Sequence, residues 1–575
     1  MSSQPAKKRR FGGKRSKTGC RTCRIRRIKC DEAPEKCRNC TSTGRLCDGY
    51  EAYRLPVAAK RGKNLSFSLS TPVNTQIRWV VTSDQRRCFS FFCDRTITDA
   101  LGYYDSQLWE QFVFQMANIE PAVCHAAVAL GAAHQEVVFQ GINFPGNGKA
   151  GRGVWYFYAL EESARAFELL RRRNPQDPQM RQVTLLCCLL FVYLSLLQRD
   201  YDTAFRHLQA GLRVSQELRL GRCNPLFGSS LVGGGMNPHL LAAFAQLETQ
   251  STHFNPRGCS QLWANQPPRT HIRLSNDCDR DCGLLGQSVD DLRLAMQPLD
   301  SAINHFFQRL GTASAEEIVA HYSDFKAAQT HLLADLEHAT HFLDNFCALK
   351  YASLSPKHKR GADLLRLHLM TYSVGLRMSL IAQLPPAQAQ AFSADHAAIL
   401  SLARTIVAQF PDRPTIMVDS GVILPLQVVA DSCPDLHVRW QAIQELRAWP
   451  HYEGPYDSVL ASVISGARCR LELRARIRAE LRGFFDTDGT VVGKELFDRM
   501  VDEELRERLR ILAVPGGDDE GFPQASDQAD AELAQIMASA SLDNWTSPSY
   551  GGTVIADSLE VDKTVHRPGG GSPVM

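Results

Sequence analysis

The stretch CRTCRIRRIKCDEAPEKCRNCTSTGRLC, residues 20–47, sets the organisation of this 575-residue chain. It contains two halves with the same cysteine spacing, C-x2-C-x6-C, and six residues separate the halves. The cysteines are Cys20, Cys23, Cys30, Cys37, Cys40 and Cys47. Because every cysteine of one half has a counterpart in the other, the repeat indicates that all six act together.

The residue types in this stretch predict two zinc ions. A structural zinc takes four tetrahedral thiolate or imidazole ligands, and the first fifty residues contain no histidine. Two closed sites need eight sulfurs, so with six cysteines two thiolates must each bind both ions. The repeat makes Cys20 and Cys37, the first cysteine of each half, the expected bridges. The resulting cluster is an anion, which neighbouring cations stabilise.

The segment between Cys23 and Cys30 supplies such cations and has the length of about two helical turns. Ile25 and Ile28 fall three residues apart on one face of this helix, and Arg24 and Arg27 fall three residues apart on another. A short basic helix held at both ends by metal is suited to reading DNA. The expected DNA-binding residues are the four basic side chains of the segment, Arg24, Arg26, Arg27 and Lys29.

These residues resemble the DNA-binding head of the fungal binuclear zinc cluster transcription factors. The resemblance rests on the six-cysteine spacing, on the run CRTCRIRRIKCDE and on Pro34 in the loop that joins the halves. It implies two zinc ions bridged by the first and fourth cysteines. It also implies that Arg26 and Arg27 reach the base edges of a CGG-type triplet, and that the chain regulates RNA polymerase II genes in the nucleus. Many members have lysine at the place of Arg27, but arginine can bind guanine through O6 and N7 together.

Other interpretations of the cysteines remain open. A single zinc could use Cys20, Cys23, Cys37 and Cys40, like the first finger of nuclear receptors, which would leave Cys30 and Cys47 without a role. Disulfides are disfavoured because the chain starts with basic residues rather than an apolar signal segment. The alternative function is a zinc-dependent protein interaction module or co-regulator that does not read DNA sequence. An enzyme is not expected, since G-x-S-x-G, P-loop and H-E-x-x-H motifs do not occur.

The distribution of charge favours a polyanionic partner at the N-terminus. Residues 1–50 contain 15 Lys and Arg against 4 Asp and Glu, whereas the whole chain carries a net charge of only +4. We therefore expect double-stranded DNA as the partner of the head. The basic tail, residues 1–18, is predicted to be a nuclear localisation signal, followed by the binuclear zinc cluster domain at residues 19–48.

The remainder is predicted to be mainly helical. Residues 49–95 are expected to be a linker, with a short strand at residues 77–82 (IRWVVT). Residues 96–512 are expected to form a large all-α regulatory domain, which resembles that of the same family. No sustained heptad follows the cluster, so a homodimer is left open without a coiled coil to support it. The expected helices are residues 106–116, 122–139, 182–198, 289–310, 315–348, 361–382, 394–409, 436–448 and 456–483.

One of these segments raises the question of a membrane. Residues 182–198 contain no charged residue over 17 positions, slightly less than a bilayer crossing needs. An amphipathic helix follows directly, so we expect a helical hairpin with a buried first arm and no membrane partner. Cysteines outside the cluster, such as Cys124 and Cys347, lie among apolar residues and are expected to be buried thiols.

Three further segments carry weaker signals. GNGKAG, residues 146–151, is expected to be a loop rather than a nucleotide site, since no buried strand precedes it. Residues 484–497 imitate a calcium loop but place Phe484 where the first carboxylate should be. The acidic tail, residues 513–575, is expected to be disordered. It is either a solubilising tail or an activation segment that contacts the transcription machinery.

Overall fold

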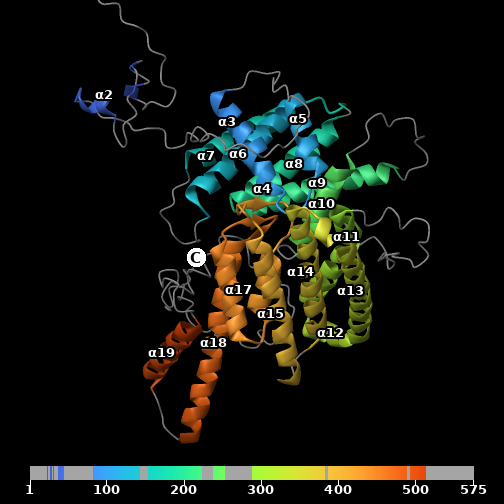
Figure 1. The fold of residues 1–575 in the computed structure, drawn as a ribbon, viewed down its shortest axis with the longest axis vertical. Coiled ribbons are helices and arrows are strands. Elements are labelled where there is room, and N and C mark those ends of the chain that lie inside the picture. Colours follow the sequence, from blue (N-terminus) through green and yellow to red (C-terminus); the bar gives the residue numbers. More distant parts are fainter. Residues whose placement is uncertain are drawn as a thin grey trace, which may run out of the picture. The chain divides into compact units, whose positions relative to one another are not determined.

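The computed structural model describes most of the helical part of the chain and a portion of the cysteine-rich stretch. The described residues are 22, 23, 26, 28, 30, 37–44, 82–142, 153–177, 179–222, 237–252, 288–381, 386–488 and 493–512. The chain divides into two units, Met1–Gln76 and Ile77–Met575. The first unit contains the cysteine-rich stretch, with one described helix, α2 (Arg38–Thr41). The second is a helical body, drawn in Figure 1. A small metal-binding domain with a mostly helical remainder is the predicted fold class, which is confirmed.

The body is built from helices of two consecutive parts of the chain (Figure 1). The first part contains α3 (Ser83–Phe91), η1 (Phe92–Thr96), α4 (Ile97–Ala100), η2 (Leu108–Phe112), α5 (Val113–Ile119), α6 (Pro121–Gln140), α7 (Val154–Arg172), α8 (Met180–Leu197), α9 (Tyr201–Arg222) and α10 (Pro238–Ser251). The second contains α11 (Val289–Thr312), α12 (Ala315–Ala320), α13 (Tyr322–Lys350), η3 (Tyr351–Ser353), α14 (Pro356–Met378), α15 (Pro386–Ala408), α16 (Ile423–Ser432), α17 (Leu436–Ala448), α18 (Ser458–Asp488) and α19 (Lys494–Leu512).

The helical body begins earlier than predicted, because α3 lies inside the expected linker at residues 49–95. Thr82 forms a capping box with Gln85: the Gln85 amide donates to the Thr82 hydroxyl at 3.2 Å, and the Thr82 amide donates to the Gln85 side chain at 2.9 Å. A box of this kind satisfies two amides of the first turn and fixes the helix start. The expected strand at residues 77–82 lies outside the described residues, except for this cap.

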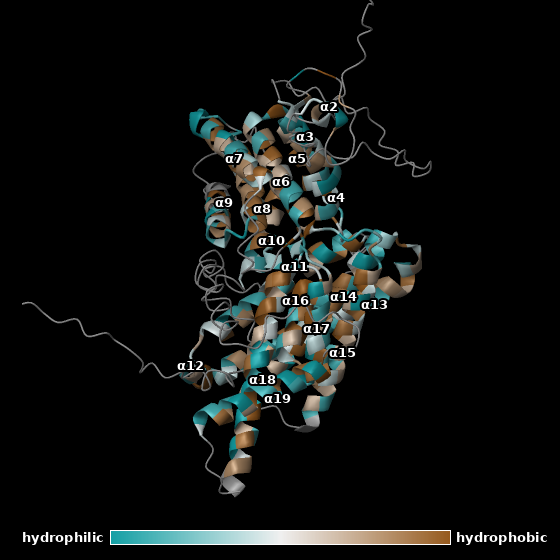
Figure 2. Ribbon diagram, turned by 90° about the vertical axis from the view of Figure 1, so that its left-hand side faces the viewer, coloured by the Kyte–Doolittle hydropathy of each residue, from teal (hydrophilic) through white to brown (hydrophobic). Residues whose placement is uncertain are grey.

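The apolar segment at residues 182–198 forms a core helix, as predicted. It corresponds to α8, which packs against α9 as a hairpin. Figure 2 draws α8 largely in the colour of hydrophobic residues. Both α6 and α8 are long and apolar enough to cross a bilayer, but 78% and 72% of their apolar windows are buried inside the body. Arg199, with φ of 57°, makes the turn between the arms and pairs with the buried Asp457 at 2.7 Å.

A small three-stranded sheet lies among the helices, with the order β1 (Ile416–Met417), β2 (Tyr452–Glu453), β3 (Tyr456–Asp457). Strand β1 pairs in parallel with β2, and β2 pairs antiparallel with β3 around Gly454, which has φ of 55°. All six strand residues are buried. The sheet connects the two parts of the body, since the Val418 amide that follows β1 donates to the Ala100 carbonyl at 3.0 Å.

The two final helices form a second hairpin. Leu473 and Ile477 of α18 are buried against Val501 and Leu505 of α19. Arginines of α18 pair with acids of α19 beside this apolar contact: Arg474 lies 2.7 Å from Asp502 and Arg478 lies 3.2 Å from Asp498. Glycine 489 of the calcium-like segment lies outside the described residues.

Candidate metal centre and nucleic-acid interface

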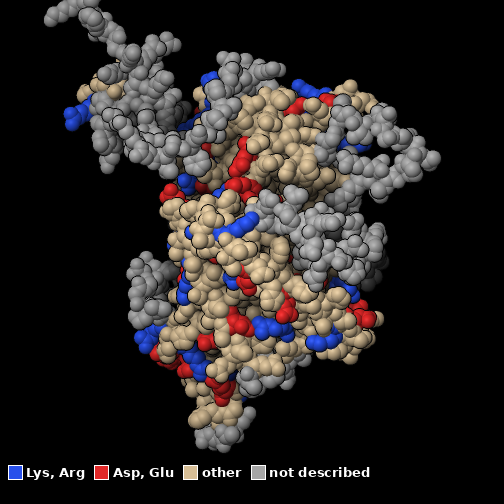
Figure 3. Space-filling view, turned by 45° about the vertical axis from the view of Figure 1, so that its right-hand side comes forward, with Lys and Arg blue, Asp and Glu red and all other residues tan. Residues whose placement is uncertain are grey.

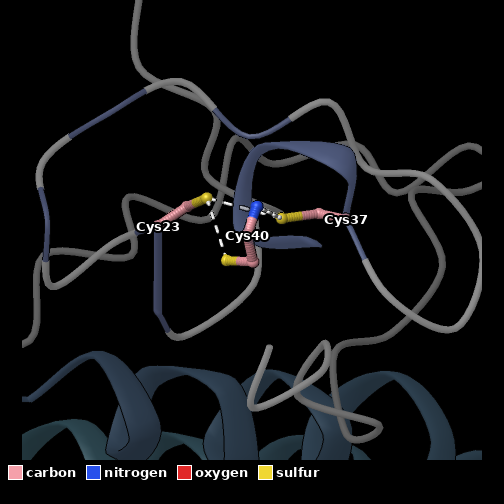
Figure 4. A group of neighbouring side chains, drawn as sticks. All are labelled: Cys23, Cys37 and Cys40. Atoms are coloured by element: carbon pink, nitrogen blue, oxygen red, sulfur yellow. Dashed lines mark hydrogen bonds between the residues drawn. The ribbon is translucent and has the colours of Figure 1, made fainter. Parts of the chain in front are cut away.

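Three of the predicted zinc ligands converge in the structure. The Cys23 Sγ atom lies 3.6 Å from that of Cys37 and 3.8 Å from that of Cys40 (Figure 4). All three side chains are fully buried, although they belong to a small unit rich in charged residues. A fourth cysteine, Cys30, is 4% exposed and belongs to the same buried cluster. Cys20 and Cys47 lie outside the described residues.

These spacings fit a tetrahedral zinc. A Zn–S bond of 2.3 Å places two sulfurs of one tetrahedron about 3.8 Å apart. The separations of 3.6 and 3.8 Å match this edge length, and they are far longer than the ~2.05 Å of a disulfide. The donors present therefore fit zinc. Because Cys23 approaches both Cys37 and Cys40, the described sulfurs are compatible with one shared ion as well as with a bridged pair.

The local fold explains why the second pair of cysteines converges. Cys37 is the N-cap of α2, so the Cys40 amide donates to its sulfur at 3.3 Å. The Cys37 carbonyl accepts from the Thr41 amide at 3.1 Å. The C-x2-C spacing thus places both sulfurs at one end of a single helical turn. An amide that donates to sulfur also favours the thiolate form, which is the form that binds metal.

The first half contains a helical turn where the basic helix was predicted. Thr22 and Cys23 are helical, and their carbonyls accept from the amides of Arg26 and Ile28, both at 3.1 Å. Ile28 is 39% exposed rather than buried. Among the expected DNA-binding residues, Arg24, Arg27 and Lys29 lie outside the described residues.

Arg26 has a contact that the sequence did not predict. Its guanidinium donates to the Asn39 carbonyl at 3.3 Å and to the Thr43 hydroxyl at 3.4 Å. These atoms belong to the second half of the cluster, so Arg26 links the two halves. Both bonds are long and lie at or near the surface, which makes each of them weak.

The cysteines of the helical body have raised pKa values, unlike cysteines that bind metal as thiolates. Burial raises the pKa of the Cys88 and Cys93 thiols to about 12 and that of Cys433 to about 11. Such groups stay protonated and unreactive near neutral pH. Cys124 is buried as predicted, whereas Cys347 is only partly buried.

Two histidines contact carboxylates but are buried away from solvent. His134 lies 3.7 Å from Asp99 and His451 lies 3.0 Å from Glu453. Both rings are at most 1% exposed, and neither lines the cavity described below. Burial lowers the pKa of His134 to about 3, which makes it a poor base near neutral pH. These contacts are therefore structural.

One further group of possible metal ligands lies in the helical body. It combines Asp105, Asp290 and His358, whose side-chain ligand atoms all lie within 4.8 Å of one another. Lys357 already pairs with Asp105 at 2.5 Å, and His358 lies 3.3 Å from the same carboxylate. These basic side chains account for the acidic pair without a metal ion.

The comparisons with known proteins agree with the metal centre. Residues 18–54 match the family model of the fungal Zn(2)-Cys(6) binuclear cluster domain. Residues 18–54 are therefore a domain of the fungal binuclear zinc cluster type, and the resemblance seen in the cysteine spacing is confirmed. No solved structure matches the chain.

The curated relatives are named as fungal transcription regulators. The aspercryptin biosynthesis cluster-specific transcription regulator of Emericella nidulans is 31% identical over 231 residues, which cover 36% of this chain and 35% of the relative. The transcription regulator lscL of Purpureocillium lilacinum is 25% identical over 34% of this chain and 48% of its own length. The transcriptional regulatory protein moc3 of Schizosaccharomyces pombe is 65% identical, but over only 37 residues, 6% of this chain and 7% of its own. The chain thus spans between a third and a half of the first two relatives.

Proposed function

We propose that this protein is a nuclear, sequence-specific DNA-binding regulator of RNA polymerase II genes. Its head reads CGG-type triplets through a cluster of two zinc ions. The observation that carries the proposal is the convergence of three buried sulfurs at tetrahedral spacing, in a stretch whose sequence has four basic residues between Cys23 and Cys30. The names of the curated relatives support the same class of function.

The contacts of Arg26 suggest that the basic residues have different roles in DNA binding. Since Arg26 bonds Asn39 and Thr43, base contact by its guanidinium requires the loss of two weak bonds between the halves. Arg27 has the side chain suited to bidentate recognition of guanine and carries the larger share of base reading in our proposal. Arg24 and Lys29 bind phosphates, which positions the head without selecting sequence.

Selection of DNA from a random pool by the purified full-length chain tests the proposal. We expect enrichment of CGG-type triplets, and the spacing of enriched triplets reports whether one or two heads bind. Arg27→Ala should reduce the preference for the cognate triplet by about 1–3 kcal/mol. Arg38→Ala, an exposed residue of α2, removes the same charge and should weaken binding to all sequences alike.

An Arg27→Ala variant with unchanged site preference would contradict the assignment of Arg27. A wild-type chain that enriches no sequence, although it binds zinc, would instead favour the protein interaction module.

The terminal segments take supporting roles in this proposal. The basic tail, residues 1–18, directs nuclear import, and the acidic tail, residues 513–575, contacts the transcription machinery. Removal of residues 513–575 should lower the output of a reporter with CGG-type sites while leaving DNA binding intact. Unchanged reporter output would assign the tail a solubilising role only.

A further inference from the structure

A partly open cavity of about 390 Å³ lies in the helical body, in the size range of small-molecule sites. Its wall combines segments that are far apart in the chain: the loop before η2, η2 itself, α8, α10, α11, α14, the residues after β1, the start of α16 and β3. Five aromatic side chains line it, namely Tyr104, Trp109, Tyr193, Tyr372 and Tyr456. The described residues of its wall all belong to the second unit.

Carboxylates outnumber basic side chains among the described residues of the wall. The carboxylates are Asp105, Glu110, Asp290, Asp291, Asp300 and Asp419, and the basic side chains are Arg293, His239 and His368. Asp105 and Asp290 already contact Lys357 or His358. Arg293 is already neutralised, since it donates to Asp419 at 2.5 Å and to the Gln246 side chain at 2.6 Å. Its guanidinium also stacks over the Tyr104 ring, 4.8 Å from the centroid. This arginine is therefore not available for an anionic ligand.

Asp300 is the carboxylate best placed to bind a ligand. It keeps partial exposure and lines the cavity. Its Oδ1 atom accepts from the Tyr372 hydroxyl and from the Asn304 side-chain amide, the latter at 2.9 Å. Within the described part of the chain Asp300 makes no ion pair. Both of its direct partners are neutral donors. Burial raises the pKa of this carboxyl, and the nearby His368 and Arg293 offset only part of that effect.

The neighbouring polar atoms lack donors. Asn304 is 4% exposed, and its Nδ2 atom is committed to the Asp300 carbonyl and carboxylate, which fixes the orientation of the amide. Its Oδ1 atom has no hydrogen-bond partner among the described residues. The same holds for the Oε1 atom of Gln250, which is 7% exposed and also lines the cavity. Buried acceptors of this kind are rarely left without a donor.

We propose that this cavity binds a small organic amine in its ammonium form. The Asp300 carboxylate pairs with the ammonium, and the apolar part of the amine packs against the aromatic rings. A carboxylate without an ion pair beside several π faces suits a cation that donates hydrogen bonds. An anion would meet the carboxylates of the wall, and a neutral ligand would leave Asp300 without an ion pair.

Binding of three matched probes to the zinc-loaded full-length chain tests the proposal by isothermal titration calorimetry. Tryptamine carries the ammonium, whereas indole-3-ethanol is its neutral analogue and indole-3-acetate its anionic one. We expect tryptamine to bind at least about 10-fold more tightly than either analogue, the effect of one charged hydrogen-bonding partner.

Two variants assign the effect to the cavity. Asp300→Asn removes the charge at nearly constant shape and should weaken tryptamine binding by about 10-fold or more. Asp344→Asn is the matched control, because this carboxylate lies on α13, is 45% exposed and pairs with Arg366 away from the cavity. It should bind tryptamine like the wild type.

Absence of tryptamine binding in the millimolar range would overturn the proposal. Equal affinities for the three probes, or an unchanged affinity in a folded Asp300→Asn variant, would also overturn it. If Asp300→Asn fails to fold by circular dichroism, the comparison of the three probes on the wild-type chain still decides between the outcomes.

Discussion

The Glu453 side chain forms hydrogen bonds with several segments of the helical body, although no sequence motif around it indicates this role. Its carboxylate is fully buried and accepts from the amides of Gly421, Val422 and Ile423, each at 2.9 Å. It also accepts from the Tyr103 hydroxyl at 3.2 Å and contacts His451 at 3.0 Å. These bonds satisfy the amide of Ile423, the first residue of α16, and the amides of the two residues that lead into this helix. One side chain of β2 thus fixes the start of a core helix and the position of Tyr103.

Glu453→Gln should therefore destabilise the body. The amide replaces one acceptor oxygen with a donor that faces backbone N–H groups, and we expect a loss of about 2–4 kcal/mol in the free energy of unfolding. Glu161→Gln is the control, because Glu161 is 57% exposed and pairs with Arg165 on the surface. It should change the free energy by less than about 0.5 kcal/mol. Urea unfolding followed by tryptophan fluorescence compares the two, and equal effects would contradict the role of Glu453.

His134 should make the body sensitive to acid. Burial, together with the nearby Arg95 charge, lowers its pKa to about 3, whereas the unfolded chain has the ordinary value near 6.5. The stabilising contribution of the neutral ring is complete above about pH 6.5 and is lost as the pH falls toward 3. Between pH 7 and pH 5 the wild-type chain should thus lose about 2 kcal/mol through this residue.

His134→Gln should flatten this pH dependence, whatever its effect on stability at pH 7. His341→Gln, at an exposed position of α13, should keep the wild-type slope. Unfolding in urea at pH 7, 6 and 5 measures the slopes. A His134→Gln slope equal to that of the wild type would show that another group causes the acid sensitivity.

At the scale of elements, the main question is how many zinc ions the cysteines bind. The two-ion and the one-ion arrangement share several ligands. The described sulfurs of Cys23, Cys37 and Cys40 fit either arrangement. Cys30 distinguishes the two arrangements, because the single-ion arrangement does not use it as a ligand. This residue is 4% exposed within the cysteine cluster, which favours a ligand role.

Zinc analysis of the purified chain should give two ions per chain. Cys30→Ser should lower this number, because a hydroxyl is a far weaker zinc ligand than a thiolate. Cys93→Ser is the control, since burial keeps this body thiol protonated. One zinc per chain, unchanged in Cys30→Ser, would contradict the bridged cluster.

The helices show what a pattern can and cannot predict. The helix at residues 436–448 has the predicted bounds in α17, and the buried arm of the first hairpin was recognisable from its unbroken apolar run. The helix expected at residues 315–348 is divided into α12 and α13 at His321, which has φ of −111°. Helix α3 was missed because the β-branched residues before its cap favoured a strand over the capping box.

The sheet and the cavity were not predictable for a different reason. Strands of two residues are too short to show alternation, so β1, β2 and β3 carry no periodic signal. The cavity depends on Asp300, Asn304 and Tyr372, which meet only when α11 packs against α14. The approach of Cys23, Cys37 and Cys40 to one another was predictable because the cysteine spacing is local and repeats within 28 residues.

At the scale of the whole molecule, charge is divided between the two units. The excess of cations lies in the first fifty residues, whereas the rest of the chain carries a net negative charge. On the face drawn in Figure 3, acidic and basic side chains are interspersed over the body, consistent with its many surface ion pairs. Long-range attraction to DNA therefore belongs to the head, and DNA binding should weaken as salt concentration rises.

The central claim is that zinc-bound cysteines hold the basic segment in the form that reads DNA. Fluorescence anisotropy of a labelled duplex with CGG-type triplets, titrated with the full-length chain before and after zinc chelation, tests it most directly. We predict that sequence-specific binding disappears when zinc is removed and returns when zinc is restored, because without the metal the small unit lacks its core. Unchanged affinity and sequence preference after complete removal of zinc would contradict the account.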